Sequence, residues 1–253
     1  MTSYERRLEI FDILRENKTV DVNRLADHFG VSTMTIRRDL ATFEKEGLIT
    51  TTYGGAVLNR EVQELDAAPS LQSKVDLTAR KIGSAACRRL TNGDTVFLDT
   101  GSLAVAAALS MGERTLTVVT NSLDAANVLR NFPRVRLIIA PGVFNDVRGG
   151  MLGSHTISFL RQFHFDATIL CGEYLDTSFG LSVEDETDAH LKATAIDCAA
   201  SNIILINGQD LGRTAFAQAV AWRRIQSIIT DENADPAMLD AIEKRGVDVE
   251  IAK

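Results

Sequence analysis

The chain of 253 residues is long enough for two domains, and its 45% hydrophobic and 24% charged residues describe an ordinary globular protein. No apolar stretch approaches the ~18–20 residues needed to span a bilayer, and the charged N-terminus is unlike a signal peptide, so we expect no membrane partner. The three cysteines form no CxxC pair and the four histidines no HxxE or HxxxH pattern, which argues against disulfides and a metal site. We expect no cofactor and a reduced, cytoplasmic setting.

The net charge of −7 argues against a broadly basic, DNA-binding surface. Residues 1–57 hold 8 Lys+Arg and 9 Asp+Glu, a net charge of −1, and the remainder holds 19 and 25, a net charge of −6. Contact with nucleic acid must therefore come from a local cluster, and we expect modest non-specific affinity and more than one DNA-binding unit. The candidate cations are Arg37 and Arg38, flanked by Arg6, Arg7 and Arg24.

Residues 1–58 show the pattern of three short amphipathic helices. The first runs from about Tyr4 to Glu16, and the second is closed by Gly30, a residue that accepts a positive φ angle. Ser32 is a good N-cap for the third helix. Apolar residues at i, i+4 and i+7 of that helix face the core, and they are Ile36, Leu40 and Phe43.

A two-stranded hairpin, Leu48–Thr52 and Gly55–Leu58, follows the third helix. This order of elements is that of a winged helix-turn-helix, in which hydroxyls and guanidiniums at the start of the third helix reach base edges and phosphates. An ordinary three-helix element for protein contacts is the alternative, but the full order is much harder to obtain by chance. The expected DNA-contact residues are Ser32, Thr33, Thr35, Arg37, Arg38 and Tyr53.

The stretch VSTMTIRRDLATFEKEGLITTTYGGAV resembles the N-terminal signature of the DeoR family of bacterial transcriptional regulators. The resemblance rests on T-I-R-R-D-L, on E-G-L-I and on the Y-G-G-A-V wing, and it covers the whole first domain. It implies a transcriptional regulator, in the first place a repressor, that binds a double-stranded DNA operator.

Residues 59–75 are polar, contain Pro69 and have no sustained period, so we interpret them as a linker between a domain at 1–58 and a second one at 76–253. Short Val- and Ile-rich runs, several separated by helical stretches, then predict a mostly parallel, Rossmann-like α/β sheet buried on both faces. The runs are Thr95–Leu98, Leu116–Val119, Val135–Ala140, Ala167–Leu170, Ile203–Ile206, Ser227–Thr230 and Val247–Ile251.

Small and polar residues follow five of these runs, at the strand ends where open α/β sheets bind ligands. Glycines let a ligand approach backbone N–H groups, and Ser or Thr at a helix start adds donors, which suits an anion and especially phosphate. Each loop alone is more often a plain turn, and Lys192 more often an exposed lysine, but five polar ends in one domain favour a small-molecule pocket. Together with the match described next, they give the expected effector-binding residues Asp99, Gly101, Ser102, Thr120, Asn121, Ser122, Gly142, Gly172 and Lys192.

The second domain resembles, less tightly, the DeoR-type sensor domain, whose fold is similar to that of ribose-5-phosphate isomerase and whose members generally sense phosphorylated sugars. The family's D-x-G-T-T phosphate loop matches at Asp99, Gly101 and Ser102, and its T-N-S matches in full at Thr120–Ser122. Its Gly-Gly is here Pro141-Gly142, and its E-A-x-x-K element runs from Asp188 to Lys192.

Three positions depart from the family pattern. Leu103 replaces the last Thr of the phosphate loop. In the D-x-S-K-x-G segment, Asn207 replaces the acid and Asp210 replaces the lysine. A carboxylate beside an anion site is unfavourable by Coulomb repulsion, so the pocket holds either a phosphate placed elsewhere or an effector of different charge.

Two functions fit these patterns. The first is a repressor, assembled as a dimer or a tetramer, that places paired recognition helices in successive major grooves and is gated by a small sugar-like or phosphorylated effector. The alternative is an enzyme of the sugar-phosphate isomerase or acyltransferase type carrying a DNA-binding head, with Asp99, Glu173, Asp185 and Lys192 as candidate acid–base groups. Asn207 and Asp210 remove two groups that catalysis would need, so we expect a regulator and not an enzyme.

Overall fold

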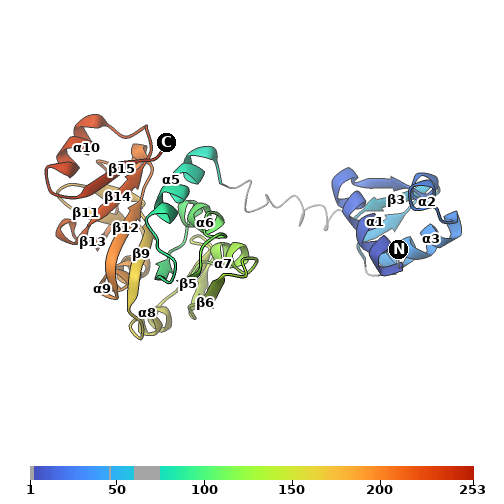
Figure 1. Cartoon of the computed structure of the whole chain (residues 1–253), viewed down its shortest axis with the longest axis horizontal. Helices are drawn as coiled ribbons and strands as arrows, with labels where there is room; N and C mark the ends of the chain where they lie inside the picture. Colours follow the sequence, from blue (N-terminus) through green and yellow to red (C-terminus); the bar gives the residue numbers. More distant parts are fainter. Residues whose placement is uncertain (1–2, 46, 60–74) are drawn as a thin grey trace. The chain divides into compact units, whose positions relative to one another are not determined.

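The computed structural model describes residues 3–45, 47–59 and 75–253 (Figure 1). The chain divides into two compact units, Met1–Gln72 and Ser73–Lys253. The linker expected at 59–75 lies almost entirely outside the described residues, so its boundaries stay a prediction. Within the described ranges no helix is both long enough and apolar enough to cross a membrane.

The first unit is a winged helix-turn-helix, as the sequence predicts. Its three strands form one antiparallel sheet in the order β1-β3-β2. Strand β1 was not expected, and by pairing with β3 it fastens the wing to the helices. In chain order the elements are α1 (Ser3–Asn17), β1 (Thr19–Asp21), α2 (Val22–Phe29), α3 (Thr33–Lys45), β2 (Ile49–Thr51) and β3 (Gly55–Leu58).

The turn between α2 and α3 forms for the reasons read from the sequence. Gly30 ends α2 with a φ of 64°, in the left-handed region that favours glycine. Gly55, the second glycine of the wing, is required for close packing instead, because a Cβ there would lie 1.8 Å from the carbonyl oxygen of Val20 in β1. Buried apolar side chains from all three helices and the wing make the core, among them Ile10, Leu14, Leu25, Ile36, Leu40, Phe43 and Ile49.

A buried ion pair joins the first and third helices. The Nε atom of Arg6 lies 2.7 Å from Oδ2 of Asp39, and the two residues are only 8% and 5% exposed. Arg6 is therefore not available as a flanking DNA contact, which corrects the expectation from sequence. Asp39, the acid of the T-I-R-R-D-L motif, holds the recognition helix against α1 instead of facing solvent.

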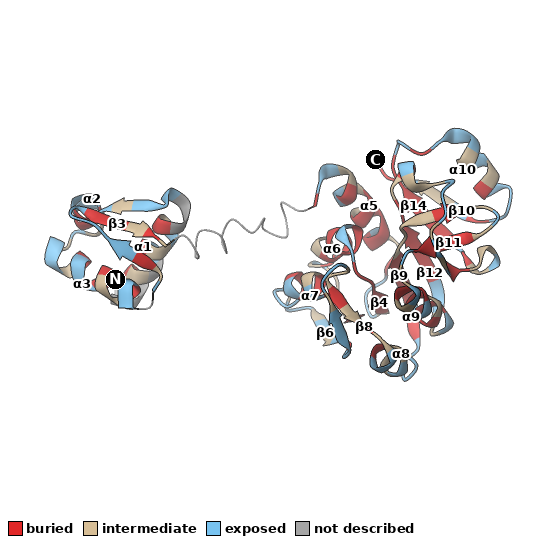
Figure 2. Ribbon diagram, turned by 180° about the vertical axis from the view of Figure 1, so that it is seen from behind, coloured by how far each residue is buried: buried red, intermediate tan, exposed pale blue. Residues whose placement is uncertain are grey.

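The second unit is built on a seven-stranded parallel sheet with the order β15-β14-β12-β9-β4-β5-β6. All seven apolar runs in the sequence correspond to these strands, which confirms the expected α/β class. Buried residues line the central strands (Figure 2), because helices and loops cover both faces of such a sheet. The strands are β4 (Thr95–Leu98), β5 (Leu116–Thr120), β6 (Val135–Ile139), β9 (Phe165–Cys171), β12 (Ala199–Leu205), β14 (Ser227–Thr230) and β15 (Asp248–Ile251).

Helices connect most of these strands, and shorter strands follow some of them. The helices are α5 (Leu77–Arg88), α6 (Ser102–Leu109), α7 (Leu123–Leu129), α8 (Ser154–Leu160), α9 (Glu186–Asp197) and α10 (Pro236–Glu243). The sequence did not reveal an antiparallel hairpin of β7 (Val143–Asn145) with β8 (Gly150–Leu152), nor a small sheet of β10 (Tyr174–Asp176), β11 (Gly180–Val183) and β13 (Ala217–Val220). These five short strands lack the unbroken Val- and Ile-rich runs that identify the strands of the parallel sheet.

Helices α5 and α6 touch through Gly83, where a Cβ would lie 2.4 Å from backbone atoms of Ala106 and Ala107. Gly83→Ala should therefore lower the melting temperature, although alanine is the better helix former by about 1 kcal/mol. Overpacking costs about 1–3 kcal/mol, and each kcal/mol is worth ~2–4 °C in a domain of this size. The neighbouring Ser84→Ala variant is the control. A Gly83→Ala protein that melts higher than the wild type would show that the helices separate freely.

Candidate functional site

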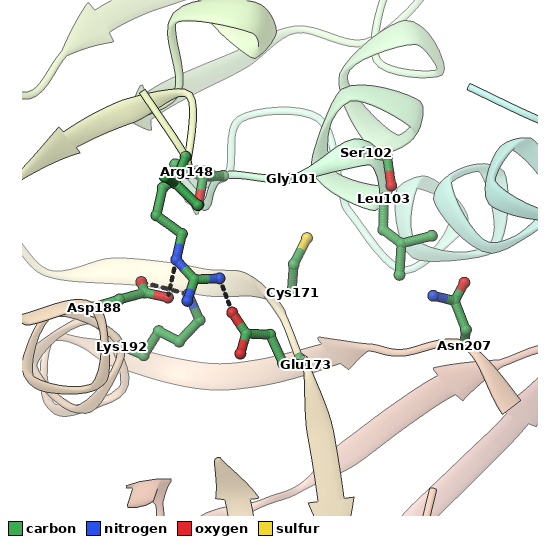
Figure 3. A pocket seen from close by; sticks show the side chains of 12 residues that line it. Gly101, Ser102, Leu103, Arg148, Cys171, Glu173, Asp188, Lys192 and Asn207 are labelled. Atoms are coloured by element: carbon green, nitrogen blue, oxygen red, sulfur yellow. Dashed lines mark hydrogen bonds and ion pairs between the residues drawn. The ribbon is translucent and has the colours of Figure 1, made fainter. Parts of the chain in front are cut away.

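A pocket lies at the carboxyl edge of the parallel sheet (Figure 3). Strand β4 stands between β5 and β9, so the chain leaves β4 and β9 toward opposite sides and opens a crevice, the usual ligand site of open α/β sheets. The pocket has a volume of about 170 Å³. Its lining residues are Thr100, Gly101, Ser102, Leu103, Val147, Arg148, Cys171, Gly172, Glu173, Asp188, Lys192 and Asn207.

The N-terminus of α6 borders this pocket. Its N-cap is Gly101, with a φ of 105° that favours glycine, and this residue offers no side chain to cap the helix. By contrast, α5, α7, α9 and α10 each begin with an Asp or Ser whose side chain accepts a backbone N–H. The first N–H groups of α6, beside Ser102 and Leu103, are therefore left for a ligand, and they carry the positive end of the helix dipole.

Under the pocket lies a buried charge cluster. The Nζ atom of Lys192 is 2.6 Å from Oδ1 of Asp188, one turn earlier on α9, and 2.9 Å from Oδ2 of Asp99, which follows β4. None of the three side chains is more than 2% exposed. Asp99 also accepts the backbone N–H of Cys171 at the end of β9. The cluster thus ties together β4, β9 and α9.

Lys192 and Asp99 influence each other's protonation. Burial alone would lower the pKa of Lys192, but the carboxylates of Asp99 and Asp188 outweigh it and raise that pKa above its usual value. Burial raises the pKa of Asp99, against the opposing effect of Lys192. Lys192 is therefore a fixed ammonium ion, held by two carboxylates.

A second, more exposed ion pair lies at the rim. Arg148, from the turn of the β7–β8 hairpin, pairs with Glu173 after β9, and its Nε atom is 3.9 Å from Oδ2 of Asp188. The side chains of Arg148 and Glu173 are 18% and 25% exposed. Sequence reasoning missed Arg148, since no local pattern indicates that a hairpin turn reaches the sheet edge.

The expected effector residues fall into two groups. Gly101, Ser102, Gly172 and Lys192 line the pocket, and Asp99 lies beneath it, bound to Lys192. Thr120, Asn121, Ser122 and Gly142 do not line it. Their role as effector contacts stays a prediction that no contact of the pocket supports.

These four residues have partners within the protein. The hydroxyl of Thr120 accepts the N–H of Ser122, and the hydroxyl of Ser122 caps α7 by accepting the N–H of Ala125. The side-chain amide of Asn121 donates to the carbonyl of Met151 in β8. Gly142 is packed closely, since a Cβ there would lie 2.2 Å from Oγ1 of Thr156.

Asp210, whose charge the sequence places beside the anion site, is paired within the protein. It does not line the pocket. Its carboxylate accepts the amide of Asn207 at 3.3 Å and pairs with Arg213 at 3.3 Å. Arg213 in turn stacks on the ring of Tyr174, 4.2 Å from its centroid. The negative charge that replaces the family's lysine is therefore matched by a cation three residues later.

Cys171 is a poor nucleophile in this setting. Burial raises the pKa of its thiol, and the nearby Asp99 raises it further. A thiolate is therefore disfavoured in the pocket.

The first unit carries a candidate DNA interface at the start of α3. The hydroxyl of Ser32 accepts the N–H of Thr35 and lies 2.9 Å from the Thr35 hydroxyl, so this pair fixes the first turn. Arg37 and Arg38 are exposed, and neither has an ion-pair partner within the described residues. Tyr53, at the tip of the wing, is fully exposed. All six expected DNA-contact residues lie on α3, at its cap or on the wing, and their role as contacts stays a prediction.

Family models account for both units of the chain. Residues 6–62 match the DeoR-like helix-turn-helix domain, and residues 78–232 match the DeoR C-terminal sensor domain. The chain belongs to the DeoR family. It is a DNA-binding transcriptional repressor with a sensor domain, as its sequence motifs indicated.

Relatives match this DeoR-family chain over nearly its whole length. It is 28% identical to the HTH-type transcriptional repressor GlcR of Bacillus subtilis, over 98% of this chain and 96% of that one. It is 27% identical to the glycerol-3-phosphate regulon repressor of Escherichia coli, over 99% and 100%. With the HTH-type transcriptional regulator GlpR of Haloferax volcanii it shares 30% identity, over 98% of each chain. Such relatives are regulators and not enzymes, which confirms the expectation that the chain is not an enzyme.

A solved structure is similar over part of the chain. Ribose 5-phosphate isomerase A of Methanocaldococcus jannaschii aligns over 53% of each chain, with a TM-score of 0.39 and 14% identity. This partial likeness says nothing about activity.

Lys192→Met in this DeoR-family repressor should leave the buried carboxylate of Asp99 without a cation and that of Asp188 with only the more distant Arg148. The free energy of unfolding should fall by about 3–5 kcal/mol near pH 8. Without Lys192 the pKa of Asp99 rises further in the folded state, which then binds more protons than the unfolded state, so stability is regained as the pH falls. Urea unfolding followed by the single tryptophan, Trp222, measures both effects.

Lys244→Met removes an exposed ammonium, 79% accessible, and is the matched control with a change of less than about 0.5 kcal/mol. A penalty for Lys192→Met that stays the same from about pH 8 to about pH 6 would contradict the charge cluster as its source.

Proposed function

We propose that this DeoR-family repressor senses a small phosphorylated sugar or polyol in the pocket at the carboxyl edge of its sheet. The observation that carries the proposal is the uncapped N-terminus of α6, which borders a pocket also lined by Arg148 and Lys192. Backbone N–H groups at a helix start suit a phosphate, and the side-chain amide of Asn207, which also lines the pocket, can hydrogen-bond to sugar hydroxyls.

The size of the pocket supports a small ligand. Its volume of about 170 Å³ is below the ~300–1,000 Å³ typical of sites for drug-sized molecules. The E. coli relative is named for the glycerol-3-phosphate regulon, whose namesake is a phosphorylated three-carbon polyol. We infer a ligand of that size and charge class, without assigning that compound.

Operator binding is proposed to use the head of α3 and the wing. Ser32, Thr33, Thr35, Arg37, Arg38 and Tyr53 are the proposed contacts, since they are the polar side chains gathered there. We propose that the protein acts as a homo-oligomer, a dimer or a tetramer, with its heads in successive major grooves. A repressor acts on the chromosome, and we therefore place it in the cytoplasm.

Arg38→Ala should weaken binding to a duplex selected from a random library by the full-length chain. A lost guanidinium contact to a base or phosphate costs about 1–3 kcal/mol per site, so the dissociation constant should rise at least about 10-fold in a gel-shift titration. Lys45→Ala, which removes an exposed cation from the last turn of the same helix, is the control. An equal change of the dissociation constant in the two variants would contradict a specific contact of Arg38 with the operator.

A thermal-shift panel of sugar phosphates, the corresponding free sugars and inorganic phosphate tests the effector class. A ligand that binds only the folded state raises the melting temperature, and at 100 times its Kd it adds about 2.7 kcal/mol of stability. Phosphorylated compounds should raise the melting temperature where their free sugars do not. Shifts with free sugars alone would contradict a phosphorylated effector.

A further inference from the structure

The β7–β8 hairpin brings Arg148 to the pocket through a tight turn. Gly149 has a φ of 66°, and its N–H donates to the carbonyl of Asn145 at 2.9 Å. The N–H of Arg148 donates to the side-chain oxygen of Asn145 at 3.0 Å. These bonds fix the backbone at the point from which the guanidinium reaches Glu173 and Asp188 (Figure 3).

The same hairpin is clamped to the loop after β5. The N–H of Met151 donates to the carbonyl of Asn121 at 2.8 Å, and the Asn121 side chain returns a bond to the Met151 carbonyl at 3.0 Å. The N–H of Leu123 donates to the carbonyl of Gly149 at 3.2 Å. Gly150 fits so closely that a Cβ would lie 2.6 Å from the Asn121 carbonyl oxygen. The T-N-S motif thus supports the hairpin that presents Arg148.

The two cations of the pocket differ in how firmly they are held. Lys192 is 2% exposed and lies between two buried carboxylates, so moving it would strand both of them. Arg148 pairs at the rim with Glu173, which is 25% exposed and is hydrated when it is released. Arg148 is therefore the cation that can exchange its partner.

We propose that Arg148 is the effector-recognising cation of this pocket and that Glu173 is its competitor in the absence of ligand. An anionic group of the effector takes the guanidinium from Glu173, in the two-bond geometry that guanidinium forms with phosphate. This assignment rests on the proposed phosphorylated effector, and it makes Asn121 a positioning residue for Arg148.

The proposal predicts opposite effects for the two members of the pair. Arg148→Gln should weaken binding of a phosphorylated ligand at least about 10-fold, the worth of a charge-assisted hydrogen bond, and Arg148→Lys should recover part of it. Glu173→Gln should tighten ligand binding, because a neutral amide competes less well for the guanidinium of Arg148. The side-chain oxygen at position 173 can still accept the N–H of Glu184. Glu184→Gln, an exposed neighbour that has no ion pair with Arg148 in the described chain, controls for the loss of one negative charge.

Isothermal titration calorimetry of the full-length chain with inorganic phosphate, glycerol 3-phosphate and the other sugar phosphates of the panel measures these changes. Far-UV circular dichroism and the melting temperature without ligand establish that each variant is folded. Wild-type affinity in Arg148→Gln, or weaker binding in Glu173→Gln, would overturn the proposal. If the ion pair were purely structural, removing either partner would lower the affinity for the ligand. If the wild type binds no phosphorylated compound, the proposed effector class fails instead.

Discussion

The sensor unit depends on one buried ammonium group. Lys192 lies between carboxylates supplied by two separate elements, the loop after β4 and the helix α9. A charge buried this deeply costs several kcal/mol unless it is fully paired, so those elements are stable only when they come together. Because β4 stands at the point where the sheet order reverses, the interaction that closes the core also forms the floor of the pocket.

Burial separates the polar residues of the pocket into a floor and a rim. In the floor, Asp99, Asp188 and Lys192 are inaccessible, and their partners are fixed by the fold. In the rim, Arg148 and Glu173 remain partly exposed, so a ligand can replace one partner at low cost. A site of this kind combines a rigid scaffold with one exchangeable contact. That contact belongs to a hairpin that Asn121, in the loop after β5, clamps through its hydrogen bond to Met151.

Local pattern explains what the sequence could predict. Apolar runs identify all seven parallel strands, and the polar residues after them identify the edge that holds the pocket. Contacts between distant residues explain what it could not. Arg6 was counted as a DNA-facing cation because its partner Asp39 is 33 positions away, and Arg148 was missed because its partners come from other elements. For Asp210 the charge argument left out Arg213, which pairs with its carboxylate.

The charge of the DNA-binding unit constrains how a signal can act. Residues 1–57 carry a net charge of −1, and the Arg6–Asp39 pair removes one more cation from the surface, so a single head has few groups for phosphate contact. Linking two heads makes the second contact intramolecular and can raise affinity by about 10²–10⁴-fold. In the proposed homo-oligomer, an effector needs only to alter how the sensor units pair, without touching α3. The size of the response is limited by the difference in effector affinity between the arrangements of the proposed oligomer.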